Sequence, residues 1–190
     1  MSQWYASLLD YETQHWNVPQ AWNVTRDEDY PENFAFSYND ILFIGINLVG
    51  GSVHDTKEWE KRQEANLQWI DQKFQLHRDS IKAFVLFAHA DPDVPSNSPF
   101  YEPFKSRVAA DYNQVPVVLI NRNLGVEPWS WETEFENISN FSVIVVEGSV
   151  WPPLMGAVDF RLENPFVFDQ ALTNSWYDEY LEHQFGNERA

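Results

Sequence analysis

The sequence predicts an α/β fold in which helices flank a mixed β-sheet. Three nearly continuous apolar runs, at residues 81–88, 115–121 and 141–148, each have the length of one strand. They alternate with two segments of helical periodicity, which begin near Asp55 and Phe100. This order of strands and helices is typical of a layered α/β domain, and the chain shows no internal repeat and no long linker. We therefore expect one domain.

The N-terminal part contains a predicted hairpin. Residues 1–30 mix Trp, Tyr, His and acidic residues without a clean period, which predicts a short helix and a loop. From Phe34 to Val49 the content of aromatic and β-branched residues rises, with a break at Asn39-Asp40. That pattern predicts a hairpin whose second strand is buried and ends at Gly50-Gly51.

Two amphipathic helices are predicted between the strands. Asp55 and Glu58 form a capping-box pattern at the start of the first helix, and Pro103 fits the first turn of the second. The inward-facing positions that recur at helical spacing are Trp59, Gln63, Leu67, Ile70 and Phe74 in the first helix, and Phe100, Phe104, Val108 and Tyr112 in the second.

The remaining strands complete the sheet. The run at 81–88 has the pattern of a strand covered on both faces, and 115–121 and 141–148 resemble it. Residues 156–162 alternate between apolar and polar, which predicts a half-buried edge strand. We divide the chain into an N-terminal extension at residues 1–25, a main domain at 26–162, and an acidic, aromatic tail at 163–190.

Composition excludes several classes of function. The 29 acidic and 12 basic residues give a formal charge of -17, which disfavours nucleic acids and anionic membranes as partners. The acidic excess can serve solubility, or it can form a cation-binding face. Without cysteine the chain has no disulfide and no thiolate nucleophile. We see no targeting signal and no apolar stretch of membrane-spanning length, so we expect a soluble chain and leave its compartment open.

Candidate site residues follow two of the predicted strands. In open α/β sheets ligands bind beyond the carboxyl ends of the strands. Two loops meet that condition. The loop after residues 81–88 carries His89 and Asp91. The loop after residues 115–121 carries Asn121, Arg122, Asn123 and Gly125. Imidazole with carboxylate or amide oxygen can bind zinc, iron or manganese. The alternatives are a hydrogen-bonded histidine at a strand end, a turn former at Asp91, and loop caps at Asn121 and Asn123.

The nine Trp residues raise a different possibility. Trp129, Trp131 and Trp151 are the strongest candidates for exposed indoles, which can stack on sugars or bind partner proteins. Packing in the core is the alternative for them. Motifs for nucleophilic serine, P-loop or zinc-protease chemistry do not occur.

Five stretches, read in order, resemble the second half of bacterial-type calcineurin-like metallophosphoesterases, the subgroup whose asparagine ligand sits in a Gly-Asp-Asn-Glu motif. They cover about residues 26–160, and NFSVIVVEGS (140–149) fits the closing strand of that family. The five stretches are Tyr30-Pro31-Glu32-Asn33, FIGINLVGGS (43–52), the helix from Arg62 to Phe74, AFVLFAHADP (83–92) and PVVLINRNLGV (116–126).

The resemblance implies a specific fold and metal site. The fold would be the C-terminal half of a calcineurin-like phosphoesterase sandwich, with a mixed sheet flanked by helices. The family uses two metal ions to bind phosphate oxygens and activate a water. His89 falls on the family's histidine after the central strand, whereas Asn121 and Gly125 stand where two imidazoles would be. Asp91, Arg122 and Asn123 become residues of the site loops.

The same resemblance predicts an incomplete site. The family's first motifs would lie before residue 26 and are missing, and a first-row metal needs about three or four protein ligands. We therefore expect a partial domain that has no catalytic residues and no metal cofactor of its own. The alternative is an active phosphoesterase with two Mn, Fe or Zn ions, completed by a separate N-terminal half. Because one half leaves a sheet face uncovered, we expect this missing half or a second copy of the chain as partner.

Overall fold

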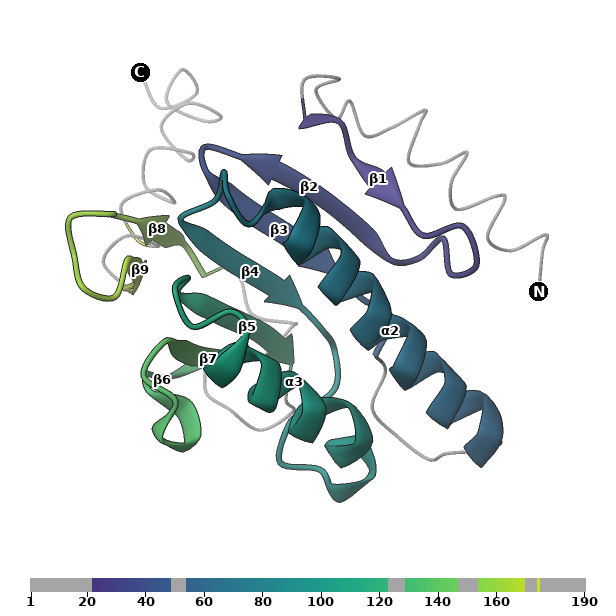
Figure 1. The fold of residues 1–190 in the computed structure, drawn as a ribbon. Coiled ribbons are helices and arrows are strands. Elements are labelled where there is room, and N and C mark those ends of the chain that lie inside the picture. Colours follow the sequence, from purple (N-terminus) through teal and green to yellow (C-terminus); the bar gives the residue numbers. More distant parts are fainter. Residues whose placement is uncertain (1–21, 49–53, 123–128, 147–153, 170–173, 175–190) are drawn as a thin grey trace, which may run out of the picture.

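The structure confirms the α/β class. A computed structural model describes residues 22–48, 54–122, 129–146, 154–169 and 174. It shows a mixed seven-stranded sheet with helices α2 (Thr56–His77) and α3 (Ser98–Ala110) packed on one face (Figure 1). The sheet consists of β1 (Thr25–Arg26), β2 (Phe34–Tyr38), β3 (Ile41–Gly45), β4 (Ala83–Phe87), β5 (Val117–Arg122), β6 (Trp129–Glu132) and β7 (Phe141–Val146). The other elements are the 3-10 helices η2 (Pro95–Asn97) and η3 (Phe135–Asn137) and a two-stranded sheet of β8 (Gly156–Val158) and β9 (Phe166–Phe168).

Four neighbouring strands of the main sheet are parallel. The strand order is β1-β2-β3-β4-β5-β7-β6, with β3, β4, β5 and β7 parallel and β1, β2 and β6 antiparallel to their neighbours. The predicted hairpin joins β2 to β3 through Asn39 and Asp40, whose φ angles are 49° and 63°. Two successive positive φ values match the right-handed twist of the paired strands. The carboxyl ends of the four parallel strands therefore meet at one edge.

Helix α2 begins where its capping residue predicts. The Oδ1 atom of Asp55 accepts hydrogen bonds from the backbone N–H groups of Lys57 at 3.0 Å and Glu58 at 3.1 Å. These bonds satisfy two of the four donors that a helix leaves unpaired at its N-terminus. The inward face of the helix buries Leu67 and Ile70 against the sheet, as the periodicity predicts.

Helix α3 begins earlier than expected. Helix η2 ends at Asn97 and leads directly into α3 at Ser98, so Pro99 occupies the first turn. Pro103 consequently lies inside the helix, and its predicted place in the first turn is wrong. Local periodicity located the helix but could not show that the preceding loop winds directly into it.

Each face of the sheet carries its own apolar cluster. The cluster under the helices includes Leu42, Ile44, Phe84, Leu86 and Leu119 with side chains from α2 and α3. The cluster on the opposite face is formed by Ile41, Ala83, Val85, Val118 and Ile144 with Phe166 from β9. Successive strand residues point to opposite faces, so two apolar faces explain the uninterrupted apolar runs.

Residues 156–162 do not form an edge of the main sheet, and that prediction is wrong. β8 pairs antiparallel with β9, which lies beyond residue 162, and the edge strands of the main sheet are β1 and β6. The β8–β9 hairpin thus spans the predicted boundary between main domain and tail. The helix expected within residues 1–30 falls mainly outside the described residues, which begin at Trp22 and show the short strand β1. No helix in the described part has the length and apolarity needed to cross a bilayer.

Candidate functional site

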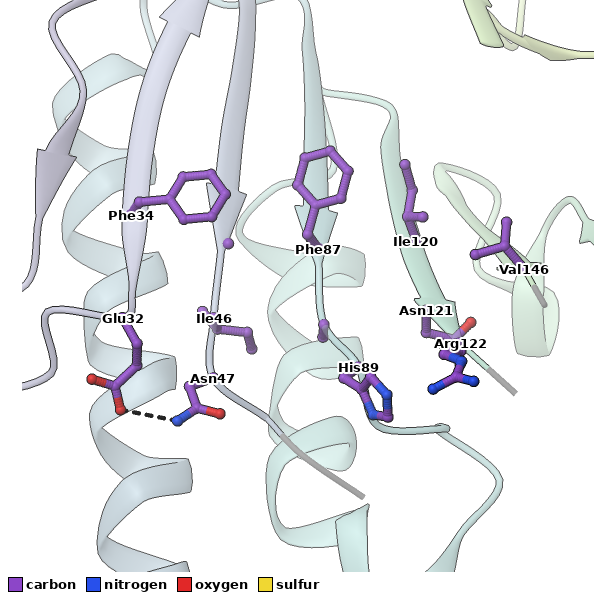
Figure 2. A pocket seen from close by; sticks show the side chains of 12 residues that line it. Glu32, Phe34, Ile46, Asn47, Phe87, His89, Ile120, Asn121, Arg122 and Val146 are labelled. Atoms are coloured by element: carbon purple, nitrogen blue, oxygen red, sulfur yellow. Dashed lines mark hydrogen bonds between the residues drawn. The ribbon is translucent and has the colours of Figure 1, made fainter. Parts of the chain in front are cut away.

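A shallow groove of about 510 Å³ lies at the carboxyl edge of the parallel strands, on the face opposite the helices (Figure 2). This is the position where α/β sheets commonly bind ligands. Its apolar part is formed by Phe34, Ile46, Phe87, Ile120 and Val146, and its polar side chains are Glu32, Asn47, His89, Asn121 and Arg122.

The sheet register brings three sequence-predicted residues together. Phe87 of β4 and Ile120 of β5 are directly paired, so His89 and Asn121 follow at the ends of adjacent strands. His89 is exposed and has no hydrogen-bond partner among the described residues. Figure 2 shows the His89 imidazole and the Arg122 guanidinium extending past the ends of these strands, at the end of the groove away from Glu32. Both side chains therefore lie at the same end of the groove.

Asn121 is the most unusual polar residue of the groove. The residue is 2% exposed, yet neither amide atom has a hydrogen-bond partner within the described part of the chain. A buried polar group without a partner costs about 1–3 kcal/mol, and most buried polar groups in native proteins are paired. Asn121 pairs with Val145, so this unused donor and acceptor lie on the helix side of the sheet, away from the face that carries Ile120 and Arg122.

Glu32, at the other end, is fully engaged. Its Oε1 atom accepts hydrogen bonds from Asn47 Nδ2 at 3.0 Å and from Arg62 Nη1 of helix α2. Burial raises the pKa of Glu32, but the hydrogen bonds from Asn47, its own backbone and Arg62 together hold the pKa below the ordinary value of 4.5. Glu32 therefore stays ionised and forms an ion pair with Arg62.

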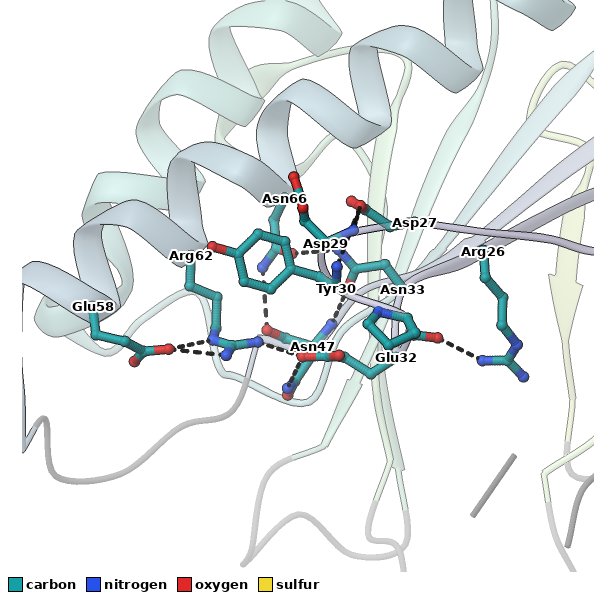
Figure 3. A network of polar contacts seen from close by, with 11 residues as sticks. Arg26, Asp27, Asp29, Tyr30, Glu32, Asn33, Asn47, Glu58, Arg62 and Asn66 are labelled. Carbon is teal, nitrogen blue, oxygen red and sulfur yellow. Dashed lines mark hydrogen bonds and ion pairs between the residues drawn. The ribbon is translucent and has the colours of Figure 1, made fainter. Parts of the chain in front are cut away.

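A ring of buried amides fixes this end of the groove (Figure 3). Asn33 Nδ2 donates to Asn66 Oδ1 at 2.9 Å, and Asn66 Nδ2 donates to the carbonyl of Asn47 at 3.2 Å. The backbone N–H of Asn47 donates to Asn33 Oδ1 at 2.8 Å. These bonds join the turn before β2, the end of β3 and helix α2. The Arg62 guanidinium also lies 4.9 Å from the centre of the Tyr30 ring.

The other predicted site residues lie elsewhere. Asp91 does not line the groove: its Oδ1 atom accepts from the N–H of Asp93 at 2.9 Å, and its carbonyl accepts from Asn97 Nδ2 at 2.8 Å. Asp91 thus stabilises the turn by accepting this hydrogen bond, as its alternative role as a turn former predicts. Asn123 and Gly125 fall outside the described residues.

Sequence reasoning did not assign Glu32 or Asn47 to the site. Glu32 comes directly before a predicted strand and Asn47 lies within an apolar run, so local patterns indicate only a turn and a strand end. Only the pairing of β2 with β3 places both residues at the carboxyl edge.

The donors of the groove do not fit a two-metal centre. Among the described residues the groove offers one exposed imidazole, two amide side chains and a carboxylate that Arg62 already holds. No group of three or more His, Asp or Glu residues in the described part of the chain is arranged to hold a metal ion. Two first-row metal ions require more ligands than this set supplies.

The tryptophans of β6 are half-buried. Trp129 and Trp131 pack against the apolar cluster opposite the helices, and the Trp131 ring lies 4.9 Å from that of Phe168. This packing agrees with the core-packing alternative and not with exposed indoles, because the β8–β9 hairpin contacts the same sheet face. Trp151 lies outside the described residues.

Comparison of the chain with family models, curated proteins and solved structures finds no match.

Proposed function

We propose that this chain is a partial calcineurin-like metallophosphoesterase domain that does not hydrolyse phosphoesters on its own. The arrangement of the groove carries this proposal. His89 and Asn121, which the resemblance aligns with metal-ligand positions, lie at the ends of adjacent parallel strands and line one groove. The described donors around them are too few for a two-metal site.

The buried amide ring gives further support. Asn33, Asn47 and Asn66 come from three separate stretches that carry the resemblance, and the hydrogen bonds join all three. The stretches therefore combine into one structural unit, as expected for parts of one ancestral domain.

Metal content and hydrolysis of an aryl phosphate test the proposal. The purified chain would be supplied with manganese, iron or zinc, and we expect less than one metal ion per chain and no turnover above that of the free metal. His89→Ala and the control His54→Ala, which changes an exposed histidine before α2, should then behave alike. Stoichiometric metal with turnover that His89→Ala abolishes and His54→Ala preserves would contradict the proposal.

A second candidate is an enzyme completed by a separate N-terminal half. It is favoured by an aromatic row on the sheet face opposite the helices, where Trp22, Phe36 and Phe43 are stacked and half-exposed. Such a surface suits a packing partner. In the same assay, this candidate predicts turnover only after a complementing half is added.

A further inference from the structure

We propose that the groove binds a small organic anion without a metal ion, with the anionic group beside Arg122 and His89 and the apolar part on Phe87 and Ile120. The inference rests on the proposed function, because it assigns the ligand role to side chains where an active phosphoesterase would use metal ions.

The direction of the side chains at the end of β5 is the first argument. Arg122 pairs with Val146 and follows Ile120 by two residues, so its side chain lies on the same face as Phe87 and Ile120. Asn121 pairs with Val145 on the helix side, and both of its amide atoms are buried. Arg122, together with the exposed His89, therefore provides the polar side chains at this end of the groove.

The charges at this end favour an anion. Arg122 has a guanidinium with five N–H donors, so it can donate to a ligand in the groove and to another group of the protein at the same time. His89 adds an exposed imidazole from the adjacent strand end. The one carboxylate among the described lining residues, Glu32, lies at the opposite end and is compensated by Arg62. The anion-binding end is therefore a local exception on a chain of formal charge -17.

The apolar part of the groove sets the second requirement. Phe87 and Ile120 are half-buried neighbours on β4 and β5, with Phe34 and Val146 on either side. The volume of about 510 Å³ is within the range of small-molecule sites. A ligand that combines an oxyanion with an aromatic or aliphatic group would use both parts, and inorganic phosphate would use only one.

Titration with phenylphosphonate in the presence of EDTA tests the inference. Phenylphosphonate carries an anion and a ring and has no ester to hydrolyse. We expect saturable binding at one site, followed by chemical shifts of the protein in NMR spectra. Inorganic phosphate, which lacks the ring, and benzyl alcohol, which lacks the charge, should each bind at least about tenfold more weakly.

Variants locate the binding site. Arg122→Gln and His89→Ala should each weaken phenylphosphonate binding, and for Arg122→Gln we expect a loss of about tenfold or more. The matched controls Arg78→Gln and His54→Ala change exposed residues away from the groove and should leave binding unchanged. Thermal unfolding of each variant shows whether it is folded, and the ligand preference of the wild type tests the inference even where a variant is not.

The outcomes separate this inference from the proposed function. Absence of saturable binding, equal binding of the three probes, or unchanged binding by both groove variants would overturn the inference alone, provided that the chain holds no metal and has no turnover. Binding that EDTA abolishes and added metal restores would overturn the inference. Together with stoichiometric metal and turnover, that result would overturn the proposed function as well.

Discussion

Two buried asparagine sites near the same edge of the sheet differ in one respect. Asn66 is 1% exposed, and its amide accepts from Asn33 and donates to the carbonyl of Asn47. Asn121 is 2% exposed, and neither of its amide atoms has a partner among the described residues. Burial is therefore equal, and hydrogen bonding separates them.

The difference distinguishes an amide that joins three segments from one that joins none among the described residues. The ring around Asn66 joins a turn, a strand end and helix α2, so it fixes the position of Glu32 and Asn47 in the groove. Asn121 makes no such connection within the described part of the chain. We therefore expect the Asn66 amide to raise stability and the Asn121 amide to lower it.

Replacing Asn66 should have the largest effect on stability. Asn66→Leu leaves Asn33 Nδ2 and the carbonyl of Asn47 buried without their partners, and we expect the free energy of unfolding to fall by about 3 kcal/mol. Urea denaturation measures this change. The control Gln68→Leu alters an exposed residue on the same helix and should change stability little. A loss as small as that of the control would show that the ring is not a structural element.

Replacing Asn121 should have a smaller effect of opposite sign. Asn121→Leu exchanges an unpartnered amide for an apolar side chain of similar size, and we expect the free energy of unfolding to rise by about 1 kcal/mol. The same urea experiment compares it directly with Asn66→Leu. Destabilisation by as much as Asn66→Leu would mean that the Asn121 amide has structural partners, and the contrast between the two sites would disappear.

Much of the fold could be predicted because the deciding signals are local. The cap at Asp55, the break at Asn39-Asp40 and the apolar run before His89 each describe a structure within a few residues. The carboxyl-edge rule then selected the segments after residues 81–88 and 115–121, which the pairing of β4 with β5 brings to one edge of the sheet.

The errors come from pairings between distant segments. Residues 156–162 alternate as an edge strand does, but which sheet they join depends on Phe166–Phe168, which a local pattern cannot show. β6 lies outside β7 although it precedes β7 in the chain, and no periodicity encodes that order. The position of Glu32 in the groove likewise depends on the pairing of β2 with β3 and on Arg62 of helix α2. Non-local contacts of this kind limited the prediction of fold and site alike.

Glu32 lines the groove and also accepts hydrogen bonds from Asn47 and Arg62. Acid titration shows whether these hydrogen bonds stabilise its carboxylate. Its pKa is lowered in the folded state, so its contribution to stability is present above the ordinary pKa of 4.5 and is lost as the pH falls through the lowered value. Wild type should therefore exceed Glu32→Gln in stability at pH 6, by less than about 1 kcal/mol because the ion pair with Arg62 is partly exposed to solvent. The two should converge below pH 4.5, as urea denaturation at each pH would measure. The control Glu60→Gln, at an exposed position of α2, should show no such convergence. If the difference between wild type and Glu32→Gln were independent of pH, Arg62 and Asn47 would not stabilise the carboxylate, and Glu32 would belong to the groove alone.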